Sequence, residues 1–406
     1  MNRKLIFACL TALMATTISF TSCTEDKLED TIFDPTDYPL DRSAYTFPLD
    51  TFIKVNFLEP YNLRFVYRME DVGSDLNKNL VPASYQKSVE LAVLTKYLWY
   101  DVYKKHAGAE FLRQYSPRII HVIGSKNINA SQGTEVAGVT EGGIKITLYN
   151  TNGLDAKNLQ LMNDYFFGTM HHEFGHVLDQ NRLHPTDFNT ISSGHYNSSS
   201  WQETSDSISL GLGFVTSYGS SATGEDWVEI IANYITLSPA EWEAKMNTAC
   251  YEWEEIDYDA TYMSRRSNGD RDTVGYVYPK ANGDMKIVRR KCMRDPETDY
   301  CLLDSKGEVQ WSHETGIDGK ATIERKLAMV RDWMKTYFKA NLDSIRNEVH
   351  SRQFVTDAAG NVQYDVVGKV FYPQNKLVEK QADGRTFMEH LTDEVEQYKA
   401  LQSKQE

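Results

Sequence analysis

The stretch TMHHEFGHVLDQ, residues 169–180, constrains what this chain can fold into more than any other segment. It contains the pattern His-Glu-x-x-His, with His172 and His176 four residues apart. On a helix these two side chains share one face, where both imidazoles can reach one metal ion at about 2.0–2.1 Å. Glu173 would then sit about 100° round the helix, close enough to reach a metal-bound water without being a ligand. The pattern predicts a helix that carries a zinc-hydrolase site, while His171 points elsewhere on that helix and is expected to be structural.

A second helix is expected over GEDWVEIIANYI, residues 224–235, because its apolar residues recur at helical spacing. Thr223 is a suitable N-cap for this helix. Glu225 and Glu229 are four residues apart and share the edge opposite the apolar stripe. Two carboxylates on one helix usually form only a solvated face. Beside His-Glu-x-x-His, however, Glu225 would complete the His, His, Glu donor set of a catalytic zinc site.

Other polar residues near the motif have weaker interpretations. A histidine at position 182 would indicate a different class of zinc protease, but that position is Arg182, so that class is rejected. His184 and His195 lie in loop-like stretches, where a histidine is more often a surface group than a metal ligand. Asp179 could accept a hydrogen bond that orients a ligand histidine, or could be a plain carboxylate on the helix surface.

The bulk composition limits the kinds of partner. The chain has 406 residues, of which 41% are hydrophobic, enough for a packed globular core. Its formal net charge of −14 disfavours nucleic acid as a partner, because phosphate binding is dominated by Lys and Arg.

The chain begins like an exported protein. Residues 1–22 have a short basic start, an apolar body and small residues before Cys23, so they predict a signal peptide that is removed. A Cys at this position resembles the acylated residue of a bacterial lipoprotein, which implies a membrane anchor on Cys23. Residues 23–50 are expected to form an acidic tether, and CTEDKLED resembles the surface-export signal of Bacteroidota-type outer-membrane lipoproteins. An ordinary solvated linker is the alternative for this segment.

The remaining cysteines are an odd number, namely Cys250, Cys292 and Cys301. They allow at most one internal disulfide and leave one free thiol. Cys292 and Cys301 flank the turn-like RDPETD and could pair across a hairpin, and all three are expected to be structural.

Strand and helix patterns indicate an α+β chain. A helix is expected over VELAVLTKYLWYDVYKKHAG, and strands are expected over RIIHVIGS and GGIKITLYN. The stretch TEGGIKITLYN has two interpretations. It could be an edge strand that pairs with an extended peptide, or it could be an ordinary strand. A long helix is expected over one apolar stripe, Ile323, Leu327, Val330, Met334 and Phe338, followed by a further helix to about Val349. The expected divisions are a catalytic domain over 51–250, a β-rich insert over 251–320, helices completing the catalytic domain over 321–353, and a C-terminal extension over 354–406.

Two motifs together resemble the active site of a known class of zinc proteases. HEFGHVLDQ followed by TSYGSSATGEDWVE resembles the active site of the gluzincin class and is similar in spacing to the lethal-factor-type toxin proteases. The resemblance implies that His172, His176 and Glu225 bind Zn²⁺ and that Glu173 is the base. It also implies that Tyr218 faces the reacting carbonyl, and that Glu229 accepts a hydrogen bond that orients a ligand histidine.

From about residue 60 to about residue 352 the chain also resembles the family of putative zinc-binding metallopeptidase lipoproteins associated with TonB-dependent nutrient import. The segments that carry this resemblance are PYNLRFVYR, NLVPASYQKSVELAVLTKYLW, GTEVAGVTEGGIKITLYN, HHEFGHVLDQ and LAMVRDWMKTYF. It implies a zincin-like catalytic domain made of a small sheet and an active-site helix, followed by a helical part. The implied partners are a peptide or protein substrate, a TonB-dependent transporter and that transporter's surface binding lipoprotein.

These patterns predict a zinc-dependent metallohydrolase, and within that class a metallopeptidase at the cell surface. One alternative is a non-catalytic surface lipoprotein that captures peptide or glycan for a transporter. That alternative predicts a closed zinc site with a fourth protein ligand, for which His184 and His195 are the candidates. Hydrolysis of an amide in some non-peptide substrate is a further alternative, which the sequence does not separate from peptidase action.

Overall fold

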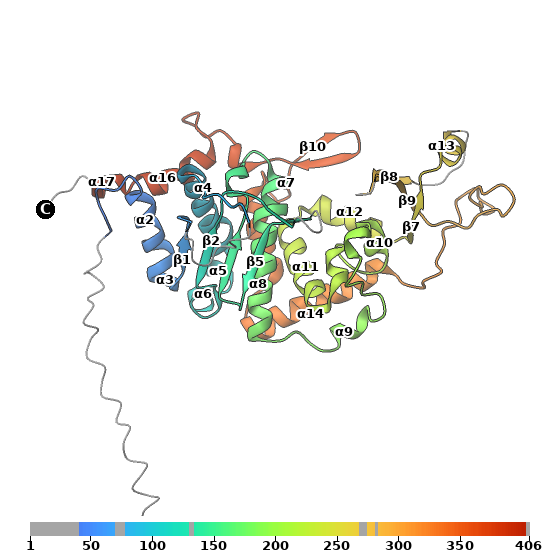
Figure 1. Ribbon diagram of the computed structural model, residues 1–406, viewed down its shortest axis with the longest axis horizontal. Helices are drawn as coiled ribbons and strands as arrows, with labels where there is room; N and C mark the ends of the chain where they lie inside the picture. The colour runs from blue at the N-terminus through green and yellow to red at the C-terminus, as the bar shows by residue number, and fades with distance from the viewer. Residues whose placement is uncertain (1–39, 70–77, 130–133, 268–273, 281–282, 403–406) are drawn as a thin grey trace, which may run out of the picture. The chain divides into compact units, whose positions relative to one another are not determined.

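A computed structural model describes residues 40–69, 78–129, 134–267, 274–280 and 283–402 (Figure 1). The chain divides into two units, Met1–Phe47 and Pro48–Glu406, with the boundary inside helix α2 (Phe47–Ile53). The expected signal peptide and Cys23 lie outside the described residues, as does most of the expected tether. Helix α2 starts ahead of the expected domain boundary at residues 50 and 51, because Leu49 and Phe52 are fully buried core residues. The helices of the described residues all lack the length and hydropathy of a membrane span.

A four-stranded sheet has the order β1 (Arg64–Val66), β2 (Ile119–Val122), β6 (Lys145–Leu148), β5 (Gly138–Glu141). The first three strands are parallel, and β5 runs antiparallel to β6. Strand β6 is therefore hydrogen-bonded on both sides, and Ile146 and Leu148 on it are fully buried. The suggestion that TEGGIKITLYN is the edge strand is wrong for β6, because the edge position belongs to β5.

The helix expected over residues 89–108 is present as one continuous run. It consists of α4 (Tyr85–Thr95), a π-helical turn η3 (Lys96–Tyr100) and α5 (Asp101–His106). Ser84 caps its start, because its hydroxyl accepts a hydrogen bond from the Lys87 amide at 3.3 Å. The run ends before Gly108, whose φ of +93° is a conformation that favours glycine.

The helix that carries the histidine motif also begins with irregular turns, namely α7 (Leu159–Leu161) and η5 (Met162–Phe167), and continues as α8 (Gly168–Asn181). Its apolar face, which includes Phe174, is buried in the core. Strand β5 passes very close to α8, since a Cβ added to Gly138 would lie 2.3 Å from Thr169 Cγ2. On the other side, a Cβ added to Gly175 would lie 2.9 Å from Val228 Cγ1 of α11. These close approaches set α8 between the sheet edge and α11 (Figure 1).

Helix α11 (Thr223–Thr236) is the second helix expected from the sequence. Trp227, Ile230 and Ile231 on its apolar stripe are buried, as the helical spacing predicts. Thr223 is the first helical residue and not the cap; the N-cap is Ala222, whose side chain makes no capping hydrogen bond. The helix packs against α8, α14 (Gly319–Phe338) and α15 (Leu342–Gln353).

The β-rich insert forms a three-stranded antiparallel sheet with the order β7 (Trp253–Asp257), β9 (Met285–Arg290), β8 (Val274–Pro279). It also contains a short helix that no pattern in the sequence indicates, α13 (Ala260–Ser267). Cys292 and Cys301 form a disulfide with their Cα atoms 6.0 Å apart. Cys250 is a free thiol.

The long helix α14 buries all five residues of the expected stripe. It begins at Gly319, slightly before the expected boundary at residue 321. The C-terminal extension contains a hairpin of β10 (Tyr364–Val367) and β11 (Val370–Pro373), followed by η8 (Lys376–Val378), α16 (Phe387–Glu396) and α17 (Lys399–Gln402).

The remaining described elements are short helices and one further hairpin. They are α3 (Glu59–Tyr61), α6 (Ala109–Tyr115), β3 (Asn127–Asn129), β4 (Thr134–Val136), η4 (Thr151–Gly153), α9 (Phe188–Ile191), η6 (Trp201–Glu203), α10 (Asp206–Gly211), η7 (Tyr218–Ser221) and α12 (Pro239–Ala249), together with the π-turn η2 (Lys54–Leu58). The described chain is thus a mixed α+β fold with small sheets and many helices, as expected.

Candidate metal centre

Helix α8 supplies three neighbouring polar side chains. His172 and Glu173 are each only 8% exposed, and His176 follows one turn later on the same face as His172. The imidazole rings of His172 and His176 have their centroids 4.8 Å apart. Because the rest of the helix is anchored in the core, these side chains are held at a fixed position on the helix surface.

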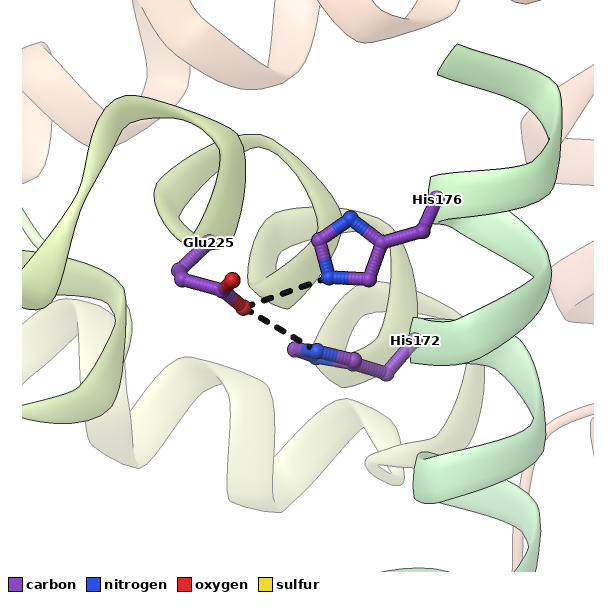
Figure 2. A group of neighbouring side chains, drawn as sticks. All are labelled: His172, His176 and Glu225. Carbon is purple, nitrogen blue, oxygen red and sulfur yellow. Dashed lines mark hydrogen bonds and ion pairs between the residues drawn. The ribbon is translucent and has the colours of Figure 1, made fainter. Parts of the chain in front are cut away.

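Helix α11 brings Glu225 to both histidines (Figure 2). Its Oε2 atom lies 3.2 Å from His172 Nε2 and 3.3 Å from His176 Nε2. All three candidate ligand atoms lie within 4.8 Å of one another. Among the described residues, this is the one group of three or more His, Cys, Asp or Glu side chains with that geometry.

The donor set fits a zinc ion. Zinc bonds of about 2.0–2.2 Å in a tetrahedral site separate neighbouring ligand atoms by roughly 3.3–3.5 Å. The measured separations between the carboxylate and the two imidazoles are 3.2 and 3.3 Å, close to that value. Two imidazoles and one carboxylate are also the donors of catalytic zinc sites, which leave the fourth position to water or substrate.

The charges at this cluster favour an ionised carboxylate. Burial alone would raise the pKa of Glu225, but hydrogen bonds from His172 and His176 lower it well below its usual range. Burial likewise disfavours a charged His172, whereas the carboxylates of Glu225 and Glu229 raise its pKa to about 10. The raised pKa of His172 means that this imidazole holds a proton, which a metal cation has to displace when it binds.

Glu229 is one helical turn beyond Glu225 and contacts His172 from the side opposite the ligand atom. Its Oε1 lies 2.7 Å from His172 Nδ1. Its Oε2 accepts hydrogen bonds from Thr216 Oγ1 at 2.6 Å and from Asn233 Nδ2 at 3.2 Å. A carboxylate in this position fixes the orientation of the His172 ring and keeps Nε2 directed toward Glu225.

Tyr218, in the turn η7, borders the same cluster. Its ring centroid is 5.7 Å from that of His172 and 4.7 Å from that of Trp201. Burial, and next the negative charge of Glu225, raise the pKa of Tyr218 above its usual value. The phenol therefore remains a hydrogen-bond donor at physiological pH.

A cleft of about 540 Å³ opens beside these residues. Its walls come from the β4–β5 segment, α8, the turn that carries Tyr218, and the C-terminal half of α11. The residues that line it are Glu135, Val136, Ala137, Gly138, Asn163, Asp164, Gly168, Thr169, His172, Glu173, Trp201, Gln202, Thr216, Tyr218, Glu229, Ala232, Asn233, Thr236 and Leu237. Glu173 thus has access to a molecule bound next to the histidines.

Asp179 does not act on the metal cluster as expected. Its carboxylate accepts hydrogen bonds from the backbone amide of His184 at 2.7 Å and from His184 Nδ1 at 3.0 Å. Asp179 lies three residues beyond His176, so it emerges near the end of α8, where the chain turns back toward it. The interpretation that it orients a ligand histidine is therefore wrong.

The other histidines lie outside the cluster. His184 bonds to Asp179 and Asn189, and His195 lines a separate cavity of about 400 Å³. Neither belongs to the group that could hold a metal, so within the described residues the site has no fourth protein ligand. His171 is fully buried with Nδ1 3.1 Å from the Tyr103 hydroxyl, consistent with a structural role.

Three residues of the site did not stand out in the sequence, namely Trp201, Thr216 and Asn233. Asn233 is four residues past Glu229 on the same helix, so helical spacing could have identified it. Trp201 and Thr216 lie in irregular chain between helices, where no periodic pattern signals a contact with α8 or α11.

Comparison with known proteins shows to which protein family the chain belongs. Residues 43–343 match a protein family described as "putative zinc-binding metallo-peptidase". This match covers most of the 406 residues, so the chain belongs to that family. Family membership is consistent with the zinc-metallohydrolase class that the histidine motif predicts.

One solved structure gives the same class. It is the crystal structure of a putative zinc-binding metallo-peptidase from Bacteroides caccae, with 32% sequence identity to this chain and a TM-score of 0.53. The match covers 75% of this chain and 91% of that one. No curated protein matches the chain.

Proposed function

We propose that this protein is a zinc-dependent metallopeptidase. The observation that carries the proposal is the approach of Glu225 Oε2 to both histidine Nε2 atoms, at 3.2 and 3.3 Å, next to Glu173 in an open cleft. Family membership supports the same assignment. His172, His176 and Glu225 would hold the zinc ion, and the cleft would hold the scissile bond.

A bound zinc ion supplies Lewis acidity, which lowers the pKa of water and polarises a carbonyl group. Glu173 acts as the general base and takes the proton from the attacking water. The same carboxylic acid then returns that proton to the nitrogen of the leaving amine. Glu173 is suited to both steps because it borders the cleft without being among the metal-binding atoms.

Tyr218 donates a hydrogen bond to the carbonyl oxygen as negative charge develops on it. Its raised pKa supports this role, because the phenol keeps its proton over the working pH range. Glu229 holds the His172 ring in the orientation that directs Nε2 toward Glu225, where these side chains would hold the zinc ion.

The edge strand β5 offers a way to align a peptide. Gly138, at its start, lines the cleft, and in the four-stranded sheet β5 pairs with β6 alone. An extended substrate could add to this edge through backbone hydrogen bonds, as in β-strand addition. The approach of β5 to α8 at Gly138 would bring such a peptide close to Glu173.

The test is peptide cleavage by the zinc-loaded wild type and by Glu173→Gln. The substitution keeps the size of the side chain but removes the base, so the cleavage rate should fall by about 10²–10⁴-fold while zinc is retained. Glu243→Gln, at an exposed position on α12, is the matched control and should cleave like the wild type. Full activity of Glu173→Gln would rule out this role for Glu173.

We also propose that the protein is exported and anchored by lipid on Cys23 at the outer membrane, where it serves nutrient import. The sequence of residues 1–30 supports this proposal, with its apolar segment, the following cysteine and the acidic run. A peptidase at that surface would supply fragments to a TonB-dependent transporter and its binding lipoprotein.

A further inference from the structure

We propose that Thr216 is a positioning residue that couples the ligand His172 to Tyr218. The inference rests on the proposed function, because it concerns two groups of the same site. It adds a residue that neither the sequence motifs nor the metal-binding group identify.

The Thr216 hydroxyl makes two hydrogen bonds at once. It donates to Glu229 Oε2 at 2.6 Å, and it accepts from the backbone amide of Gly219 at 3.0 Å. A hydroxyl can serve as donor and acceptor simultaneously, which neither a methyl group nor an ammonium group can do. Thr216 therefore links a carboxylate of α11 to the turn that carries Tyr218.

On one side, the link reaches the metal site through Glu229. The Glu229 carboxylate is partly buried, with Oε1 against His172 Nδ1 at 2.7 Å. Its other oxygen depends on Thr216 and on Asn233, whose amide also donates to the Glu229 carbonyl oxygen at 3.0 Å. The hydrogen bond from Thr216 is the shorter of the two, so its loss would leave a partly buried, charged oxygen poorly satisfied.

On the other side, the link reaches Tyr218 through its own turn. Gly219 directly follows Tyr218, and its amide is tied to Thr216 Oγ1, so the hydroxyl fixes the backbone on either side of the tyrosine. The turn also lies directly on α11, since a Cβ added to Gly219 would be 3.6 Å from Asp226 Cα and 3.7 Å from Glu229 Cβ. A shift of the Glu229 carboxylate would thus be transmitted to Tyr218, and a shift of the turn to His172.

The first test is metal affinity and does not depend on activity. Cobalt(II) takes the same donor set as zinc and gives a visible spectrum when bound, so it can be titrated into the metal-free protein. Thr216→Val replaces the hydroxyl with a methyl group of similar size and should weaken cobalt binding by about 10- to 100-fold. Thr216→Ser keeps both hydrogen bonds and should bind cobalt like the wild type, with an unchanged spectrum.

The second test is a double-mutant cycle on the zinc-loaded enzyme. Tyr218→Phe removes the oxyanion donor and should lower kcat by about 100-fold. If Thr216 acts through Tyr218, the double variant Thr216→Val, Tyr218→Phe should lose clearly less kcat than the product of the fold-losses of the two single variants. Asn233→Leu is the comparison variant, because it removes a donor to the same Glu229 oxygen but leaves the hydrogen bond between the Gly219 amide and Thr216 in place. Its effect should come closer to multiplying with that of Tyr218→Phe than the effect of Thr216→Val does.

The coupling would be overturned if Thr216→Val bound cobalt with wild-type affinity. It would also be overturned if the kcat effects of Thr216→Val and Tyr218→Phe multiplied fully. If the wild type cleaves no peptide, the proposed function fails, whereas the cobalt titration still tests the link from Thr216 to His172. If Thr216→Val does not fold, Thr216→Ala takes its place in both tests. Loss of cobalt affinity in Thr216→Ser as well would show that size and not the hydroxyl matters, and would contradict the proposal.

Discussion

Two adjacent histidines on α8 have opposite surroundings. His171 is fully buried against Tyr103 and Trp99, and burial lowers its pKa to about 3. Burial also opposes a charge on His172, but its contacts with Glu225 and Glu229 raise its pKa to about 10. One position along a helix is a rotation of about 100°, enough to move an imidazole from the core to the metal cluster.

A single carboxylate, Glu348, should make the stability of the fold depend on pH. Burial opposes its ionisation, yet hydrogen bonds from Lys105 and Arg352 lower its pKa to about 2. This value lies below the usual value of about 4.3 in an unfolded chain. The ionised form therefore stabilises the fold above about pH 4.3, and this contribution is lost as the pH falls toward 2.

The measurement is urea unfolding of wild type and Glu348→Gln between pH 3 and pH 7. The difference between their free energies of unfolding should be largest near neutral pH and shrink toward pH 3. The exposed substitution Glu243→Gln should cause no such pH-dependent difference. A difference that is constant with pH would mean that Glu348 acts by packing and not by charge.

At the residue scale, spacing along a helix was sufficient to find part of the site. His172, Glu173 and His176 share one helix, and Glu225 and Glu229 share another, so their relative directions follow from 3.6 residues per turn. The contact of Asp179 with His184 depends on how the chain turns after α8, and that of Thr216 with Glu229 depends on tertiary packing. Neither contact leaves a pattern in the sequence, so the sequence predicts neither the hydrogen bond between Asp179 and His184 nor the contact of Thr216 with Glu229.

At the scale of elements, a buried ion pair joins α11 to α14 next to the metal ligand. Lys326 Nζ lies 2.6 Å from Asp226 Oδ2, with the two side chains 0% and 1% exposed. Lys326 also donates to the Gly213 carbonyl at 2.8 Å, and the Tyr196 hydroxyl donates to Asp226 at 2.9 Å. Four segments around the site, namely α11, α14 and the stretches at Gly213 and Tyr196, are thus joined by one pair of charges.

Breaking this pair from one side should destabilise the fold strongly. Lys326→Met leaves the Asp226 carboxylate buried without its cation and should cost about 3–5 kcal/mol in the free energy of unfolding. The double variant Lys326→Met, Asp226→Leu removes both charges and should recover much of that loss, since apolar replacements of buried pairs are often neutral. Urea unfolding measures both, and equal destabilisation of the single and double variants would contradict this account.

Long amphipathic elements were predictable, whereas strand order was not. The stripe of α14 and the run α4–η3–α5 follow from helical periodicity, which depends on local sequence alone. The edge position of β5 depends on which strands pair across the chain, and no local pattern in GGIKITLYN contains that information. Helix α13 was missed because it is short and lies between strand-like, turn-rich runs.

At the scale of the whole molecule, the family match covers residues 43–343 and so includes the metal site and the β-rich insert. The expected lipid anchor, Cys23, precedes the matched residues.

If Cys23 carries the lipid, Cys23→Ala should release the protein from the membrane fraction of expressing cells, because no lipid can then be attached. Membrane fractionation with immunodetection measures this, and a Cys250→Ala variant, which alters the exposed free thiol, should stay with the membrane. Membrane retention of Cys23→Ala would contradict lipid attachment at this residue.

Metal analysis of the purified chain from Thr24 onward tests whether His172, His176 and Glu225 together hold one zinc ion. Wild type and the exposed-site control Glu243→Ala should each contain about one zinc per chain, whereas Glu225→Ala should lose it, because two imidazoles alone bind zinc weakly. A wild type without zinc, or a Glu225→Ala variant that retains it fully, would contradict this set of zinc ligands.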